Sequence, residues 1–292
     1  GVAQVARIER EMASIRAELG FTGSKADFHA QLARDPRFFA RTPEEFGERL
    51  MTYANRLEPL LDRAFARRPR ARGDVRRLPP ALEPSMTFGY YQVPTPADSV
   101  GHYFFNGTQL AERSLLTAAP LIAHELWPGH HFQVNLAREN AALPNYRRQR
   151  YYTAFGEGWG DYASIVAGEL GLYADPYDRY GRLAMDMFIS CRLVVDTGMN
   201  ALGWSRERAM AYLREHALGM DMAELPNALL PATAGRTHRI NNPGFRHVRV
   251  SNDWLWGGSR RARRSVRDER TFVAVSIPIG PTYRFATSYS HE

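Results

Sequence analysis

Three features are scarce in this 292-residue chain, and each scarcity excludes something. Cys191 is the only cysteine, so neither an internal disulfide nor a zinc site built from several thiolates can form. Its apolar neighbours predict a buried, structural thiol. No apolar run approaches the roughly 18 residues that a membrane-spanning helix needs. Lys25 is the only lysine, so nearly all positive charge is carried by arginine.

The net charge of +7 is confined to the end of the chain. Residues 1–225 carry 27 basic and 27 acidic side chains, whereas residues 226–292 carry 11 arginines and four acidic residues. Such a charge run is more typical of a solvated or disordered segment than of a binding site for nucleic acid or an acidic partner. The densest part of this charge run contains Arg260, Arg261, Arg263, Arg264 and Arg267. We therefore expect no nucleic-acid partner.

Apolar periodicity predicts a mainly α-helical fold. Thr42 and Glu45 predict a capping box at the start of one helix, and Ser205 is the predicted cap of the last one. Residues 86–106 are instead rich in aromatic and turn residues, which predicts two short strands around a proline-containing turn. Beyond about residue 225 the helical period is lost. Besides the helix that begins at Thr42, helices are expected near 3–19, 109–127, 147–170, 178–200 and 205–217, the last being the one capped by Ser205.

The stretch HELWPGHHFQ carries the strongest chemical signal. His124 and Glu125 begin like a zinc-protease helix, in which a second histidine four residues on shares the face of the first. Pro128 stands at that position and must bulge or kink the helix. In an ideal helix, His131 returns to within ~20° of the face of His124 but lies ~10.5 Å farther along the axis. His130 would reach the face of His124 only if the helix widened at Pro-Gly. The spacing therefore does not decide which of the two histidines is the second ligand.

A third ligand is expected from a neighbouring helix, and Glu157 in AFGEGWGDY is the best candidate. It follows Glu125 by 32 residues, which is enough for a turn and a returning helix. Asp161, one turn further, would hydrogen-bond a ligating histidine. The alternative is a polar, hydrogen-bonded core without a metal. Close packing of this helix against another backbone is predicted from Gly156, Gly158 and Gly160.

Together the two motifs resemble the bacterial DUF885 proteins, which are placed among zincin-like metallopeptidases. The family pattern HExxPGHHxQ followed by EGWxxY matches residues 124–133 and 157–162. The resemblance extends over about residues 1–222, where VGHYFFNG and RLVVDTGMNALGWSRERAMAYL are also similar to family segments. It implies a mainly α, zincin-like (gluzincin-type) metallopeptidase domain. A small β element would lie beside the metal-binding helix.

The resemblance also implies roles for individual residues. Related zinc peptidases use a histidine after glycine as the second ligand, which corresponds to His130. The implied ligands of one Zn²⁺ ion are then His124, His130 and Glu157, and His131 and Asp161 are alternative ligands or neighbours that orient them. The implied reaction is hydrolysis of a peptide or small amide substrate. Zinc would lower the pKa of water, and Glu125 would act as general base.

Substrate contacts are predicted from the residues around this site. Strand 102–106 would pair with an extended peptide by edge addition, or it is an ordinary core strand. Arg192 would bind a substrate carboxylate or form an ion pair with Asp196, four residues on. The developing oxyanion also needs a hydrogen-bond donor. The candidate donors are Tyr90, Tyr91, Tyr103 and Tyr162.

The chain departs from the family pattern in three ways. Family members are longer, so an N-terminal helical half is expected to be missing. Residues 223–292 form a divergent, Arg-rich tail, expected to be disordered or the product of a shifted reading frame. Asn200 stands where many relatives carry histidine. These departures make a catalytically inactive, metal-binding remnant the main alternative. The sequence fits a bacterial protein that is cytoplasmic or exported, and it leaves the oligomeric state open.

Overall fold

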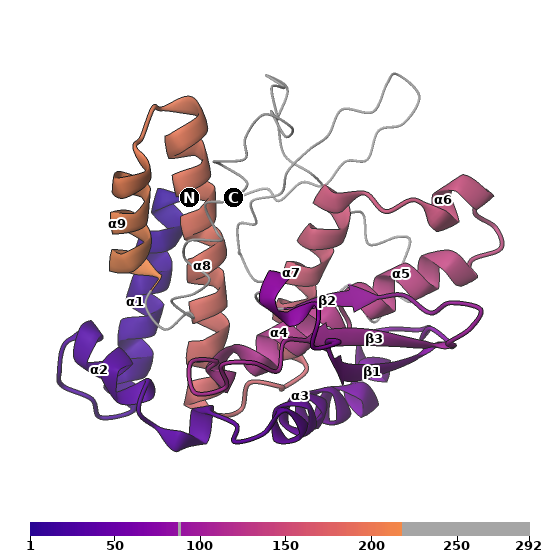
Figure 1. Cartoon of the computed structure of the whole chain (residues 1–292), viewed down its shortest axis with the longest axis horizontal. Coiled ribbons are helices and arrows are strands. Elements are labelled where there is room, and N and C mark those ends of the chain that lie inside the picture. The colour runs from indigo at the N-terminus through magenta and orange to yellow at the C-terminus, as the bar shows by residue number, and fades with distance from the viewer. Residues whose placement is uncertain (87–88, 218–292) are drawn as a thin grey trace.

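The computed structural model describes residues 1–86 and 89–217, which form a mainly helical fold with one small sheet (Figure 1). The three strands are β1 (Arg72–Arg77), β2 (Gly89–Gln92) and β3 (Val100–Phe105). One short 3₁₀ turn matters below, η4 (Leu115–Thr117). The α-helices are α1 (Val2–Glu18), α2 (Lys25–Leu32), α3 (Pro43–Leu57), α4 (Ala118–Glu125), α5 (His130–Glu139), α6 (Asn145–Gln149), α7 (Thr153–Glu169), α8 (Pro176–Ala201) and α9 (Arg206–His216).

Side-chain caps define where several helices begin. The Ser205 side chain accepts a hydrogen bond from the Arg208 amide, as predicted for the start of α9. At the start of α3, Thr42 accepts from the amide of Glu45, but the Glu45 carboxylate accepts from the amide of Arg41. The predicted capping box is therefore only half formed there. Helix α2, which the sequence did not predict, begins with a complete box of its own.

The sheet has the order β1-β3-β2, with β1 parallel and β2 antiparallel to β3. The predicted pair of strands is confirmed as β2 and β3. Strand β1 is not predicted from the sequence, because RGDVRR has no apolar alternation, and it exists through its pairing with β3. Because β3 has a neighbour on each side, the predicted edge addition of a peptide to strand 102–106 is wrong.

One face of the sheet is packed against helices. The Phe105 ring lies 5.3 Å from the Phe46 ring of α3. At the other end of this face, Gly73 and Gly101 leave room for the side chains of Trp127 and His131. A β-carbon on Gly101 would lie 2.6 Å from the His131 imidazole, so the sheet receives the chain between α4 and α5 directly.

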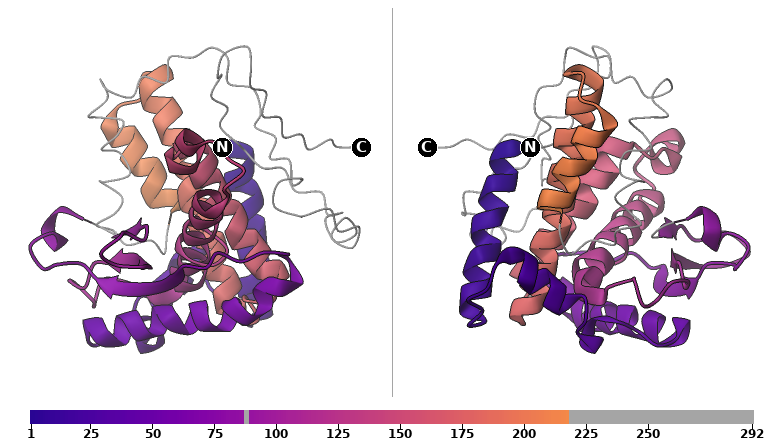
Figure 2. Two further views of the ribbon diagram at one scale, coloured as in Figure 1. Left: turned by 90° about the vertical axis from the view of Figure 1, so that its right-hand side faces the viewer. Right: turned by 60° about the vertical axis from the view of Figure 1, so that its left-hand side comes forward.

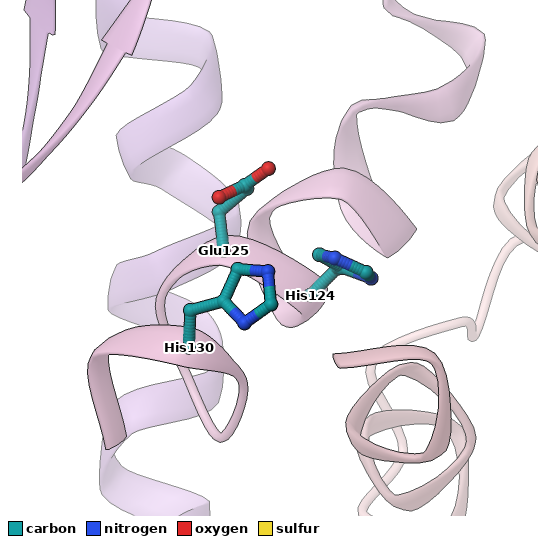
Figure 3. Close-up of side chains that lie close together, drawn as sticks. All are labelled: His124, Glu125 and His130. Carbon is teal, nitrogen blue, oxygen red and sulfur yellow. The ribbon is translucent and has the colours of Figure 1, made fainter. Parts of the chain in front are cut away.

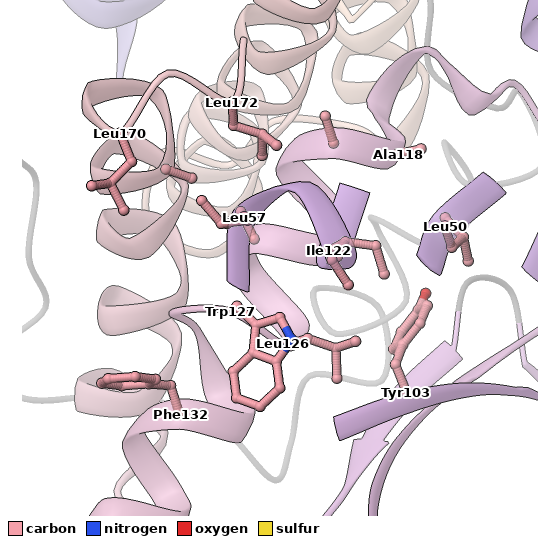
Figure 4. Packing of buried hydrophobic residues seen from close by; sticks show 14 of the residues in the cluster. Leu50, Leu57, Tyr103, Ala118, Ile122, Leu126, Trp127, Phe132, Leu170 and Leu172 are labelled. Atoms are coloured by element: carbon pink, nitrogen blue, oxygen red, sulfur yellow. The ribbon is translucent and has the colours of Figure 1, made fainter. Parts of the chain in front are cut away.

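The buried apolar residues form two cores. The first fills the space between the sheet, α3, α4 and α7, and Figure 4 shows Leu50, Leu57, Ile122 and Leu126 within it. The second joins α1, α2, α8 and α9; α1, α8 and α9 run side by side in Figure 1, and α8 and α9 stay adjacent in both views of Figure 2. Cys191 is fully buried in the second core, as predicted.

Turn η4 connects the two cores. Leu115 belongs to the first and Leu116 to the second. Helix α8 approaches this turn so closely that a β-carbon on Gly181 would lie 1.8 Å from the Leu116 carbonyl oxygen. The predicted helix over 109–127 is accordingly shorter, since α4 begins only after η4.

The predicted divergent tail at 223–292, with its arginine run, lies wholly outside the described residues. Residues 87–88, in the segment that contains β2, also lie outside them. Within the described ranges, no helix combines the length and apolar character that crossing a membrane requires.

A buried histidine lies between α2 and α8. Nε2 of His29 is 2.8 Å from the Tyr180 hydroxyl oxygen, which also accepts a hydrogen bond from Arg16. The Tyr180 hydroxyl therefore donates to His29, which must be neutral to accept. Burial, together with the nearby charges of Lys25 and Arg16, lowers the pKa of His29 to about 4.

This histidine predicts a loss of stability in mild acid. An unfolded histidine has a pKa near 6.5, so between pH 6.5 and 4 the unfolded chain binds more protons than the folded one. The free energy of unfolding should fall across this window, with His29 contributing at most about 3 kcal/mol. Urea unfolding at pH 7 and pH 4.5 would measure it. His29→Gln, which keeps an acceptor for Tyr180, should show a smaller fall, and identical falls would contradict the assignment.

Candidate metal centre

The helix that carries His124 is interrupted between α4 and α5. Helix α4 ends at Glu125, and α5 begins at His130 with Gly129 as its N-cap. A β-carbon on Gly129 would lie 1.7 Å from the carbonyl oxygen of His124, so only glycine allows this close approach. The predicted bulge or kink at Pro128-Gly129 is confirmed: α4 and α5 are separate helices, and across the break the Phe132 amide donates to the carbonyl oxygen of Leu126, six residues earlier, at 3.4 Å.

Helix α7 holds this turn in place. The indole of Trp159 donates a hydrogen bond to the carbonyl oxygen of Pro128 at 2.8 Å, and Ser164 donates to that of Pro120 at 3.0 Å. A β-carbon on Gly160 would lie 2.6 Å from the His124 ring. The predicted close packing at Gly160 is thus against an imidazole and not against another backbone.

Two histidines and a glutamate converge where these helices meet. Nε2 of His124 lies 3.5 Å from Oε2 of Glu157, and Nε2 of His130 lies 3.6 Å from the same oxygen. The two imidazole rings are 4.5 Å apart and nearly perpendicular. Glu125 completes the group, since ligand atoms of His124, Glu125 and His130 all lie within 4.8 Å of one another (Figure 3). The cluster therefore combines two imidazoles with two carboxylates.

Asp161 orients the first histidine. Its carboxylate lies 3.2 Å from Nδ1 of His124, which places the proton on Nδ1 and turns Nε2 toward Glu157. Burial by itself would lower the pKa of His124, but the bonds to Asp161 and Glu157 outweigh it and raise that pKa to about 10. The carboxylates thus stabilise positive charge at this point, as a cation site requires.

Tyr151 is a member of the site that the sequence analysis missed. Its hydroxyl donates a hydrogen bond of 2.8 Å to Oε1 of Glu157. Burial tends to raise the pKa of Glu157, but its contacts with His124, His130 and Tyr151 hold that pKa far below the usual value. No sequence signal marked Tyr151, because it precedes α7 and lies outside both motifs.

Glu125 differs electrostatically from Glu157. Burial raises the pKa of the Glu125 carboxyl, and the nearby Glu157 charge raises it too, while His124 and His130 partly offset the effect. The two glutamates are therefore unequal in basicity, a pattern typical of sites that move protons.

His131 points away from the cluster toward the sheet. Its Nε2 donates to the carbonyl oxygen of Ala71 at 3.0 Å, and Nδ1 accepts from the Tyr91 hydroxyl at 2.9 Å. Burial is the main cause that lowers the pKa of His131 to about 4. Both ring nitrogens are used, so the arrangement favours His130 over His131 as a partner of His124.

The other predicted substrate residues lie elsewhere or are occupied. Tyr103 is 1% exposed and packs in the first core, and the Tyr162 ring lies 5.8 Å from that of Trp159. Tyr90 stacks on Phe104 of the sheet.

Arg192 is not part of the cluster either. It lies over the Phe188 ring of its own helix, 5.7 Å from the ring centroid. In the described part of the chain no ion pair joins Arg192 to Asp196, and the Asp196 carboxylate accepts from Asn200 instead. The predicted ion pair is therefore wrong.

The turn at Gly129 predicts an unusually damaging small substitution. Gly129→Ala must push the chain away from His124 and separate the two histidines. We expect its free energy of unfolding to fall by about 1–3 kcal/mol or more. Gly158→Ala is the matched control, because nothing lies within 4 Å of its β-carbon position and alanine favours a helix. Equal stability of the two variants in a denaturant titration would refute the close approach.

Comparison with known proteins assigns the chain to a family. The model of the family described as "Bacterial protein of unknown function (DUF885)" matches residues 1–225. No curated protein matches the chain. The family's own description assigns no activity to the cluster.

Two solved structures share the fold. A "putative lipoprotein" from Colwellia psychrerythraea is 30% identical with a TM-score of 0.73, and the match covers 78% of this chain and 40% of that protein. A "putative lipoprotein of unknown function" from Shewanella oneidensis is 20% identical with a TM-score of 0.62, covering 80% of this chain and 44% of that protein. The chain thus spans less than half the length of either structure. From the match over residues 1–225, the chain belongs to the DUF885 family.

Proposed function

We propose that this chain carries the metal centre of a zinc-dependent hydrolase of peptide or related amide bonds. The observation that supports it is the convergence of Nε2 of His124 and Nε2 of His130 on one oxygen of Glu157. Two imidazoles and one carboxylate form a donor set that zinc takes in catalytic sites, where a further position stays open. These three residues would hold the ion.

The surroundings of the three donors fit a metal ion. Asp161 orients His124 through Nδ1, and Tyr151 holds the second oxygen of Glu157. Hydrogen bonds of this kind to the far side of a ligand are usual at metal centres. His130 is 8% exposed, and its Nε2 faces Glu157.

A zinc ion held there would supply Lewis acidity, polarising the substrate carbonyl and making water more acidic. The residues of the chain would do the rest. Burial raises the pKa of Glu125, which makes its carboxylate a stronger proton acceptor. Glu125 would take a proton from the attacking water and pass it to the leaving amine.

A catalytically inactive metal-binding remnant is the second candidate. It is favoured by one observation: of the candidate oxyanion donors, Tyr103 is buried in the first core and Tyr90 stacks on Phe104. Both solved neighbours are described as lipoproteins, which supports an exported location.

Metal content tests the proposed centre. Elemental analysis of the purified chain should give about one zinc per molecule, in line with a single three-ligand site. His130→Ala should lose the metal while melting near the parent temperature. His131→Ala should keep the metal but melt lower, because Ala71 and Tyr91 lose their buried partner. Zinc retained in His130→Ala, or a parent that binds none after incubation with zinc, would rule out the centre.

Glu125→Gln separates hydrolysis from metal binding. We expect the variant to keep its zinc and lose about 10²–10⁴-fold in the rate of cleavage of a fluorogenic peptide library, because an amide cannot accept the proton. A zinc-loaded parent without cleavage would favour the inactive remnant. A variant as fast as the parent would show that Glu125 is not the base.

A further inference from the structure

We infer that Tyr151 is a positioning residue that fixes Glu157 as a metal ligand through a single oxygen. The inference rests on the proposed metal centre and adds a residue that lies outside both sequence motifs. It concerns how the third ligand is held, and not the reacting atoms themselves.

The two oxygens of Glu157 are divided between two partners. Oε1 accepts the hydrogen bond from the Tyr151 hydroxyl at 2.8 Å. Oε2 faces Nε2 of both His124 and His130. The bond from Tyr151 thus turns Oε1 away, and Oε2 is the oxygen that faces the space between the imidazoles.

Glu157 needs this restraint more than the two histidines do. Its side chain is 51% exposed, compared with 19% for His124 and 10% for His130. The ring of His124 is held by Asp161 and packs against Gly160. A glutamate side chain that exposed would otherwise sample several rotamers, and ordering them on metal binding costs conformational entropy.

The backbone of α7 is adapted to this tyrosine. A β-carbon on Gly156 would lie 2.2 Å from both Cζ and the hydroxyl oxygen of Tyr151, so the ring lies directly against the first turn of the helix. Two residues on, Gly158 faces open space. The Tyr151 ring also meets His130 edge to face, with centroids 6.1 Å apart. One side chain therefore contacts two of the three proposed ligands.

The other role for Tyr151 would be direct donation to a substrate oxygen. Tyr151 is 45% exposed and could be reached by a substrate. Its hydroxyl proton, however, is directed at Glu157, and the ring rests on Gly156. The geometry therefore favours a role in metal binding, and the two roles give different results when metal affinity is measured apart from activity.

The test is a zinc titration of the purified chain against a chromophoric chelator, with cobalt as a spectroscopic substitute. Tyr151→Phe should weaken zinc binding about 10–100-fold and alter the visible spectrum of bound cobalt. Its melting temperature without metal should stay close to that of the parent, because only one partly exposed hydroxyl is removed. Gly156→Ala, which displaces the ring, should weaken zinc binding at least as much.

Two matched controls isolate the effect. Tyr152→Phe removes the neighbouring hydroxyl, and Gly158→Ala adds a methyl group in open space; both should bind zinc within about twofold of the parent. If the parent binds zinc and Tyr151→Phe binds it equally well, the positioning role is overturned, even if activity falls. If the parent binds no zinc, the proposed metal centre itself fails, and this inference fails with it.

Discussion

The close approach of Gly129 to the carbonyl oxygen of His124 is the constraint on which the candidate site depends. Any side chain at this position would separate α4 from α5. Because the backbone closes in there, the last turn of α4 and the first turn of α5 meet, and His124 comes within contact of His130. Trp159 then ties the turn to α7 through the carbonyl oxygen of Pro128.

The distances between the donors of this site are set by tertiary packing. In the usual His-Glu-x-x-His arrangement, one helix supplies both histidines, and local geometry alone sets their spacing. Here the donors come from α4, α5 and α7, so their distances depend on packing between helices. Leu126 and Trp127 extend into the first core and toward the sheet, which is how that packing reaches the cluster.

The adjacent histidines illustrate how one helix can serve two purposes. Neighbouring residues of a helix point about 100° apart. His130 therefore faces α4 and α7, while His131 faces the sheet and bonds to Ala71 and Tyr91. The neutral His131 anchors α5 to the strands, and the Glu157 and Asp161 carboxylates favour positive charge beside His124. Adjacent positions in the chain thus serve two different environments, the sheet and the histidine–carboxylate cluster.

The sequence by itself determined the helical class, the strands β2 and β3, the cap of α9 and the identity of most residues in the cluster, because periodicity, caps and motif chemistry act locally. Only the tertiary structure placed His130 beside Glu157 and His131 against the sheet, because the path of the chain through Pro128 and Gly129 does not follow from helical geometry. It also decided the place of β1, whose RGDVRR sequence has no strand pattern and depends on β3 for its hydrogen bonds. The place of Tyr151 in the site was likewise set by the tertiary structure, because its contact with Glu157 arises from the path of the backbone onto α7.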